Sequence, residues 1–126
     1  MTKTEATAIV KWLDQPEDHD YPAAANYLNL LRPADAVQSL VRALKESPAA
    51  QFLAKDIFRA SGLSLLGVSN SHVERDRRKI AQGKALSPLL LVRDPDRGTV
   101  IIADGYHRLC AIYGLDEDAV IPCRIV

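Results

Sequence analysis

Apolar residues in the first 48 positions recur at helical spacing. One group falls at i, i+3, i+4 and i+7, the spacing of a single buried helix face; it consists of Val37, Leu40, Val41 and Leu44. The pattern predicts a helix that begins near Pro33. Ser47 should end it, because a residue that precedes a proline, here Pro48, avoids the helical conformation.

Two further helices are expected upstream. Asp20 has the side-chain chemistry of an N-cap, and Pro22 suits a first helical turn, so a helix should run from there through Leu31. A short amphipathic helix is expected at a cluster of apolar residues before the polar segment 15–20: Ile9, Val10, Trp12 and Leu13. Residues 1–48 are therefore predicted to form an N-terminal helical subdomain.

The pattern changes after residue 49. Residues 51–58 suggest a short strand that runs into a helical turn, and residues 62–70 suggest a loop. Ser71 can cap a helix from His72 to Gln82, which Gly83 would close. The stretch 86–92 is almost continuously apolar, which is typical of a buried strand.

The last third of the chain predicts a hairpin, a helix and a closing strand. Residues 94–98 have turn chemistry, so the strands before and after them, 86–92 and 99–103, should pair. A helix is expected over 105–113, with Gly114 as its stop. The final strand, 119–126, contains Pro122, which favours a sheet edge. The predicted fold class is α+β: a small mixed sheet with helices over 49–126, plus the helical subdomain.

Composition narrows the functional classes. The 126 residues suit one domain with an appended subdomain, and the formal net charge of zero provides no global attraction for DNA or anionic lipid. Cys110 and Cys123 are too few and too far apart for a zinc site or a CxxC pair. The N-terminal segment has no signal-peptide core, and no apolar run approaches the length of a membrane span. We expect a cytoplasmic protein with no membrane partner.

The strongest chemical signal is the junction Asp104-Gly105-Tyr106-His107-Arg108, where a strand ends and a helix starts. Free N–H groups at a helix start attract anions, and His107 and Arg108 would complete an anion pocket. Alternatively, Asp104 caps the helix while His107 and Arg108 are solvated. However, cations in a first turn oppose the helix dipole, and a bound anion would offset that conflict. Asp104, His107 and Arg108 are the candidate catalytic residues.

Weaker candidates lie on other predicted helices. His72, Arg75 and Lys79 fall at i, i+3 and i+7 and could face the same anion, although a solvated face with a Glu74–Arg78 pair explains that helix by itself. An acid among Lys55, Asp56 and Arg59 could hold Mg²⁺ through phosphate oxygens, but a surface ion pair is the preferred interpretation. The glycines at 62 and 67 lack the Lys and Ser/Thr of a P-loop. Cys110 is expected to be a buried helix residue, and no protein metal-ligand set is predicted.

Residues 50–126 resemble the ParB/sulfiredoxin superfamily. The resemblance rests on three motifs in order: residues 85–92 look like its G-x-x-x-P-I-x-V strand entry, Asp104–Arg108 like its DGHHR box, and residues 119–126 like its closing V-P-V-x-V strand. It implies a small mixed sheet with helices, and a nucleotide whose phosphates sit at the Gly105–Arg108 helix start. The implied nucleotide-binding residues are Gly105, Tyr106, His107, Arg108, His72, Arg75 and Lys79.

Two departures restrict what the resemblance implies. Sulfiredoxins carry a Cys immediately before His-Arg, and here Tyr106 occupies that position, so sulfinic-acid repair is not expected. ParB proteins continue into helix-turn-helix and dimerisation domains after this box, whereas this sequence runs only to Val126, so chromosome segregation by that architecture is not expected. The expected function is binding of ATP or CTP with Mg²⁺, as an NTPase or a small-molecule kinase. The alternatives are a non-enzymatic protein- or DNA-interaction module and a ParB-like nuclease.

Overall fold

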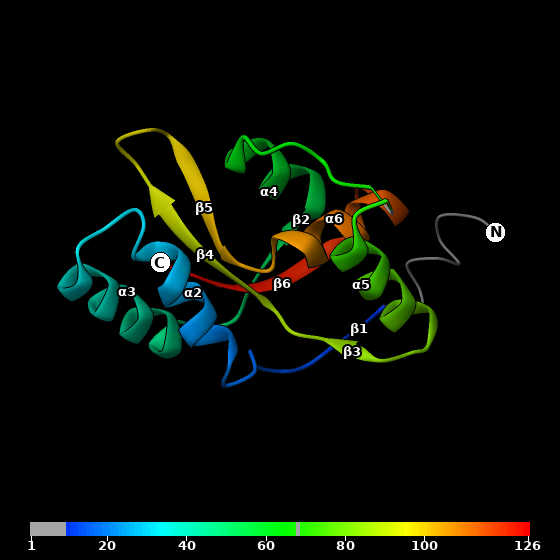
Figure 1. Ribbon diagram of the computed structural model, residues 1–126, viewed down its shortest axis with the longest axis horizontal. Coiled ribbons are helices and arrows are strands. Elements are labelled where there is room, and N and C mark those ends of the chain that lie inside the picture. The colour runs from blue at the N-terminus through cyan, green and yellow to red at the C-terminus, as the bar shows by residue number, and fades with distance from the viewer. Residues whose placement is uncertain (1–9, 68) are drawn as a thin grey trace.

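The computed structural model describes residues 10–67 and 69–126. Within these residues the fold is α+β and has three layers (Figure 1). Helices α2 (Asp20–Leu28) and α3 (Ala34–Glu46) cover one face of a four-stranded sheet. Helices α4 (Ala54–Ser61), α5 (Ser71–Ala81) and α6 (Tyr106–Leu115) lie on the other side.

The main sheet mixes parallel and antiparallel pairs. Its strands are β2 (Ala50–Leu53), β4 (Leu89–Asp94), β5 (Thr99–Asp104) and β6 (Val120–Ile125), in the order β2-β6-β4-β5. β4 is parallel to β6, and the other two pairs are antiparallel. A second, parallel sheet joins β1 (Lys11–Trp12) to β3 (Ala85–Leu86).

Strand β4 contributes to both hydrophobic cores, which explains its continuous apolar run. Leu89 and Leu91 pack in the core beneath α4, α5 and α6, whereas Leu90 and Val92 pack in the core beneath α2 and α3. Alternate side chains of a strand point to opposite faces of the sheet. A strand covered on both faces therefore needs apolar residues at every position.

The amphipathic pattern of α3 is confirmed. Val37 and Leu44 are buried, and Leu40 and Val41 pack partly buried against the same core. The β4–β5 hairpin is also confirmed, with its turn closed by backbone hydrogen bonds from Arg97 to Asp94 and from Gly98 to Pro95. No helix in the described ranges is long and apolar enough to cross a bilayer.

The predicted first helix is wrong where the structure describes it; Ile9 lies outside the described residues. Lys11 and Trp12 form strand β1, and the backbone N–H of Leu13 donates to the carbonyl of Leu86. Four apolar residues cannot stabilise an isolated turn of helix, whereas a parallel partner strand supplies hydrogen bonds directly. That partner, β3, is distant in the sequence.

The expected strand 86–92 is interrupted. β3 ends at Leu86 and β4 begins at Leu89, with Ser87 and Pro88 between them. Proline cannot donate to a strand ladder, so the chain changes sheets at this point. The two halves pair with different strands, β1 and β6.

The predicted edge position of Pro122 is wrong, because β6 lies between β2 and β4. Pro122 is paired with Gln51 of β2, and the parallel register with β4 begins one residue later, at Cys123 opposite Leu89. Proline has no backbone N–H to donate, but Pro122 precedes the hydrogen-bond ladder between β6 and β4. An inner strand can therefore contain this proline.

The predicted ends of three helices are displaced. Helix α2 has His19 at its N-cap and already ends at Leu28, and the N-cap of α5 is Asn70, whose side chain accepts from the N–H groups of His72 and Val73. Gly114 lies inside α6, where an added Cβ would lie 3.2 Å from Arg77 Nη1. Gly114 therefore leaves room for the Arg77 side chain of α5 and does not act as the predicted helix stop.

Candidate functional site

The junction between β5 and α6 is a tight turn. Asp104 ends β5, and Gly105, the N-cap of α6, has φ +110°, a conformation that favours glycine. A Cβ at this position would lie 2.7 Å from Leu89 Cγ and 2.9 Å from Arg108 Nη2. Gly105 therefore allows β4 and the Arg108 guanidinium to approach the backbone where α6 begins.

Asp104 does not cap α6. Its Oδ2 accepts a hydrogen bond from Arg108 Nη2 at 2.9 Å, and no side chain in the described ranges makes a capping bond at this helix start. Arg108 Nη2 also lies 3.4 Å from the carbonyl oxygen of Pro88. The first N–H groups of a helix have no partner within it, so the α6 N-terminus keeps its affinity for anions.

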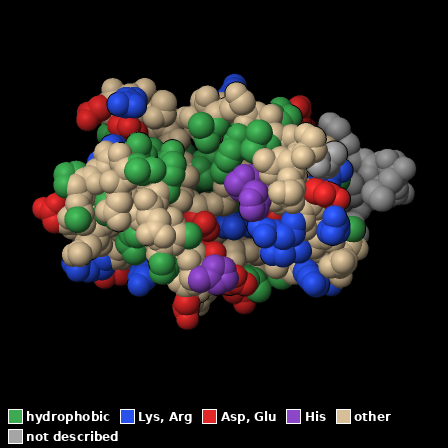
Figure 2. Space-filling model, viewed as in Figure 1, with side chains coloured by type: hydrophobic (Ala, Val, Ile, Leu, Met, Phe, Trp, Pro, Cys, Tyr) green, Lys and Arg blue, Asp and Glu red, His purple; other side chains and the backbone are tan. Residues whose placement is uncertain are grey.

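A hollow of about 260 Å³ lies over this junction. Five of the predicted site residues line it from α6 and the preceding strand end: Asp104, Gly105, Tyr106, His107 and Arg108. Arg75 and Lys79 reach it from α5. The face seen in Figure 2 shows basic, acidic and histidine side chains gathered in the middle of the molecule, where α5, the start of α6 and the turn before α2 face one another in Figure 1.

His72 lies beside the hollow rather than in its lining. Its ring is 4.8 Å from that of His107, and its Nδ1 is 3.2 Å from Arg75 Nη2. Burial lowers the pKa of His107, and the neighbouring His72, Arg75 and Arg108 lower it further, while Asp76 opposes them. His107 is therefore an uncharged hydrogen-bonding group at neutral pH.

The hollow also has an acidic wall, which was not predicted from the sequence. Glu17, Asp20 and Asp76 line the same hollow, together with His19 and Ser87. Asp20 and Asp76 are only 3% and 5% exposed. A buried carboxylate is unusual unless it is paired. The polar segment 15–20 was interpreted only as a break between helices, although its acidic residues pointed to a site.

The acidic wall acts electrostatically on the Asp104–Arg108 pair at the start of α6. Burial raises the pKa of Asp104, and Asp20 raises it further, while Arg108 and His19 lower it. Arg108 Nε is buried and has no hydrogen-bond partner among the described residues. Asp104 and Arg108, both more than four-fifths buried, thus form a poorly solvated pair with an unused donor.

Tyr106 ties the site to the loop that follows α4. Its hydroxyl donates to the carbonyl oxygen of Ser64, and its ring centroid lies 5.5 Å from that of His107. Burial raises the pKa of the Tyr106 hydroxyl, so it acts as a neutral donor. Its position supports a role in holding the loop over the α6 start.

Other candidates lie outside the hollow. Arg59 pairs with Asp56 at 3.0 Å, as the preferred surface interpretation predicted, whereas Lys55 pairs with Asp118, at 2.6 Å. The predicted Glu74–Arg78 pair is also present, at 2.8 Å.

Both cysteines are free and buried. Burial raises the pKa of Cys110, and it raises that of Cys123 to about 11. Thiolate is the reactive form of cysteine, so neither residue is suited to act as a nucleophile.

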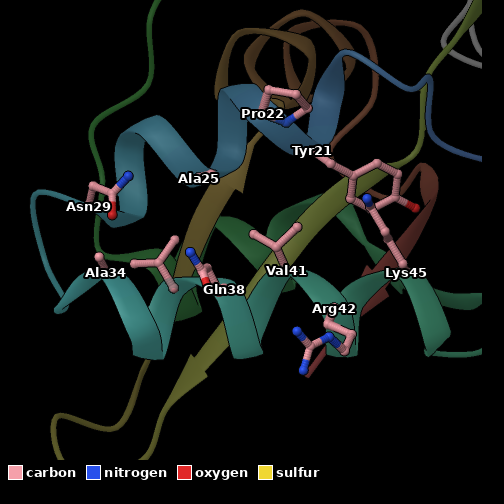
Figure 3. Close-up of a pocket in the computed structure, with 10 residues that line it drawn as sticks. Tyr21, Pro22, Ala25, Asn29, Ala34, Gln38, Val41, Arg42 and Lys45 are labelled. Carbon is pink, nitrogen blue, oxygen red and sulfur yellow. The ribbon is translucent and has the colours of Figure 1, made fainter.

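A larger hollow, of about 530 Å³, lies between α2 and α3 (Figure 3). Tyr21 and Lys45 lie at one end, with Lys45 Nζ 5.2 Å from the Tyr21 ring centroid, and Asn29 and Ala34 lie at the other. None of the described residues that line it is a carboxylate or a histidine. The smaller hollow, where titratable groups converge, is therefore the candidate functional site.

Comparison with protein-family models, curated proteins and solved structures found no match. The resemblance to the ParB/sulfiredoxin superfamily stays a prediction that rests on the three sequence motifs.

Proposed function

We propose that this protein binds the phosphate groups of a nucleotide at the N-terminus of α6. The observation that carries the proposal is the convergence of Arg75, Lys79 and Arg108 from two helices on one hollow at a helix start that lacks a side-chain cap in the described ranges. Helix N–H groups and cationic side chains together form a typical phosphate site.

The dimensions of the hollow favour phosphates over a whole nucleotide. Pockets that enclose a complete organic ligand usually have volumes of roughly 300–1,000 Å³ and are mostly apolar. This hollow is smaller, about 260 Å³, and charged groups dominate its lining. We assign it to the phosphate chain and leave the base outside it.

The residues have distinct proposed roles. Arg108 is held by Asp104, so its guanidinium is oriented before an anion arrives. Neutral His107 can accept a proton through one ring nitrogen or donate a hydrogen bond through the other near the α6 start. Arg75 and Lys79 would neutralise phosphate charge from the opposite helix. With ATP or CTP, Mg²⁺ would supply further charge neutralisation at the phosphates, and a cytoplasmic location would supply the nucleotide.

A titration with matched variants tests this proposal. Pyrophosphate, ATP and CTP, each with Mg²⁺, are titrated calorimetrically into wild type, Lys79→Ala and Arg78→Ala. The control residue Arg78 adjoins Lys79 but pairs with Glu74 outside the hollow. Lys79→Ala should weaken binding by about tenfold, near the value of one charged hydrogen bond, while Arg78→Ala should resemble wild type. Absence of binding to all three ligands, or equal effects of the two variants, would refute the proposal.

A metal-dependent nuclease or phosphodiesterase is the second candidate. Such enzymes need two or more converging carboxylates, and Glu17, Asp20, Asp76 and Asp104 all line the hollow. The net charge of zero gives no support for an extended DNA-binding surface. Hydrolysis of a bis(nitrophenyl) phosphate that requires Mn²⁺ or Mg²⁺ would favour this candidate over nucleotide binding.

A further inference from the structure

The turn before α2 gathers one imidazole and two carboxylates. His19 Nε2 lies 2.9 Å from Glu17 Oε2 and 3.4 Å from Asp20 Oδ1, and one donor atom from each of the three residues fits within a span of 4.8 Å. Ligands bound to one ion at about 2.0–2.2 Å lie roughly 3–3.5 Å apart in tetrahedral or octahedral geometry. The three groups are therefore spaced to share a metal ion with little movement.

The arrangement is open on one side and fixed on the other. Asp20 is 3% exposed and its Oδ2 accepts the backbone N–H of Glu17 at 2.9 Å, which fixes the turn. The side chains of His19 and Glu17 are 76% and 45% exposed. A metal ion could thus enter from solvent and keep water or ligand oxygens at its remaining positions.

A second acidic side chain in the same hollow, Asp76, also favours a bound cation. Asp76 is 5% exposed and lines the hollow, yet no hydrogen bond or ion pair joins its carboxylate to another residue in the described part of the chain. A buried carboxylate without a partner is costly, and a cation held nearby would reduce that cost. Asp76 belongs to α5, so its buried negative charge is an observation independent of the turn at 17–20.

We propose that Glu17, His19 and Asp20 form a divalent-metal site in the wall of the hollow, selective for transition ions such as Zn²⁺ and Mn²⁺ over Mg²⁺. The imidazole explains the selectivity. Mg²⁺ takes oxygen ligands, whereas nitrogen and mixed N/O sets favour first-row transition metals.

Binding of the metal ion does not depend on the proposed phosphate site. Coordination of phosphate oxygens by that ion does rest on the proposed function. If phosphates lie at the α6 start, an ion at this turn faces them across the hollow, because Asp20 and His19 already act electrostatically on Asp104. The ion would then complete its coordination with phosphate oxygens, and metal and phosphate would each strengthen binding of the other.

The test is calorimetric titration of Zn²⁺, Mn²⁺ and Mg²⁺ into the metal-free full chain without phosphate. Wild type is compared with His19→Ala, Glu17→Gln and the control Asp18→Asn, which changes an exposed acid between the proposed ligands. We expect one Zn²⁺ or Mn²⁺ per chain and weaker Mg²⁺ binding. Loss of a ligand should weaken Zn²⁺ binding at least about tenfold, and Asp18→Asn should leave it unchanged. Because His19 and Glu17 are exposed, both variants should fold, and circular dichroism checks this.

A second titration separates this inference from the proposed function. Pyrophosphate is titrated in the presence of chelator and in the presence of Mn²⁺. Metal binding that depends on His19, with no pyrophosphate binding under either condition, would retain the metal site and refute the phosphate site. Pyrophosphate binding that Mn²⁺ does not change would overturn the bridging role. Absence of Zn²⁺ and Mn²⁺ binding, or equal binding by wild type and both ligand variants, would overturn the metal site.

Discussion

Arg108 Nη2 and Asp104 Oδ2 lie 2.9 Å apart, one helical turn from each other across Gly105, and each side chain is more than four-fifths buried. This contact links the end of β5 to the first turn of α6. It removes the simple explanation that Asp104 caps the helix, and it holds the guanidinium at the rim of the hollow. The pair should therefore act in both stability and binding.

Removing one member of this pair should destabilise the fold. Arg108→Ala leaves the Asp104 carboxylate buried without its partner, so unfolding in urea should require about 1–3 kcal/mol less free energy than in wild type. Asp104→Asn and the double variant complete a mutant cycle, in which we expect a coupling of about 0.5–3 kcal/mol. Strictly additive effects would show that the contact does not contribute to stability.

Gly105→Ala should be much more harmful than a comparable change elsewhere. The new Cβ would meet Leu89 and Arg108 at less than 3 Å in a residue with φ +110°. We expect a loss of about 1–3 kcal/mol in the free energy of unfolding, from backbone strain and overpacking together. Gly98→Ala is the control, because φ is also positive there, +66°, but nothing lies within 4 Å of the added Cβ. Equal losses in the two variants would mean that close packing at Gly105 is unimportant.

The two leucines of α3 should differ in their contributions. Leu44 is fully buried beneath the sheet, so Leu44→Ala should lower the free energy of unfolding by about 2–5 kcal/mol through lost burial and a cavity. Leu40 packs at the margin of the same core and is partly exposed, so Leu40→Ala should have a smaller effect. Urea denaturation of both variants measures the difference. A larger effect at Leu40 would contradict this placement of α3 on the sheet.

His107 should make stability fall in mild acid. The titratable groups around it are His72, Arg75, Asp76 and Arg108, and its pKa lies below the usual value of 6.5, chiefly because of burial. The unfolded chain then binds the proton more tightly than the folded chain. The contribution is present above pH 6.5 and is lost as the pH falls through the lower folded pKa.

Comparison of wild type with His107→Gln from pH 7.5 to 5 isolates this effect. The free energy of unfolding of wild type should fall more steeply than that of the variant over this range, because the variant lacks the titrating imidazole. Parallel pH profiles of the two proteins would show that protonation of His107 does not destabilise the fold.

The hydrophobic pattern alone predicted several elements correctly, because each depends on interactions between neighbouring residues. The stripe of α3, the turn that closes the β4–β5 hairpin and the strand-to-helix junction at Gly105 all follow from local periodicity and turn chemistry. The same junction identified Asp104, His107 and Arg108, and the spacing on α5 identified Arg75 and Lys79, which the structure places around one hollow.

Tertiary structure decided what depends on distant partners. Lys11 and Trp12 are a strand because β3 lies beside them, and Pro122 is tolerated on an inner strand because the ladder with β4 begins one residue later. The hollow likewise unites Glu17, His19 and Asp20 with α5 and α6, although more than 50 positions separate them in the sequence. Local pattern determines which conformation a segment prefers, but only packing determines which segments share a site.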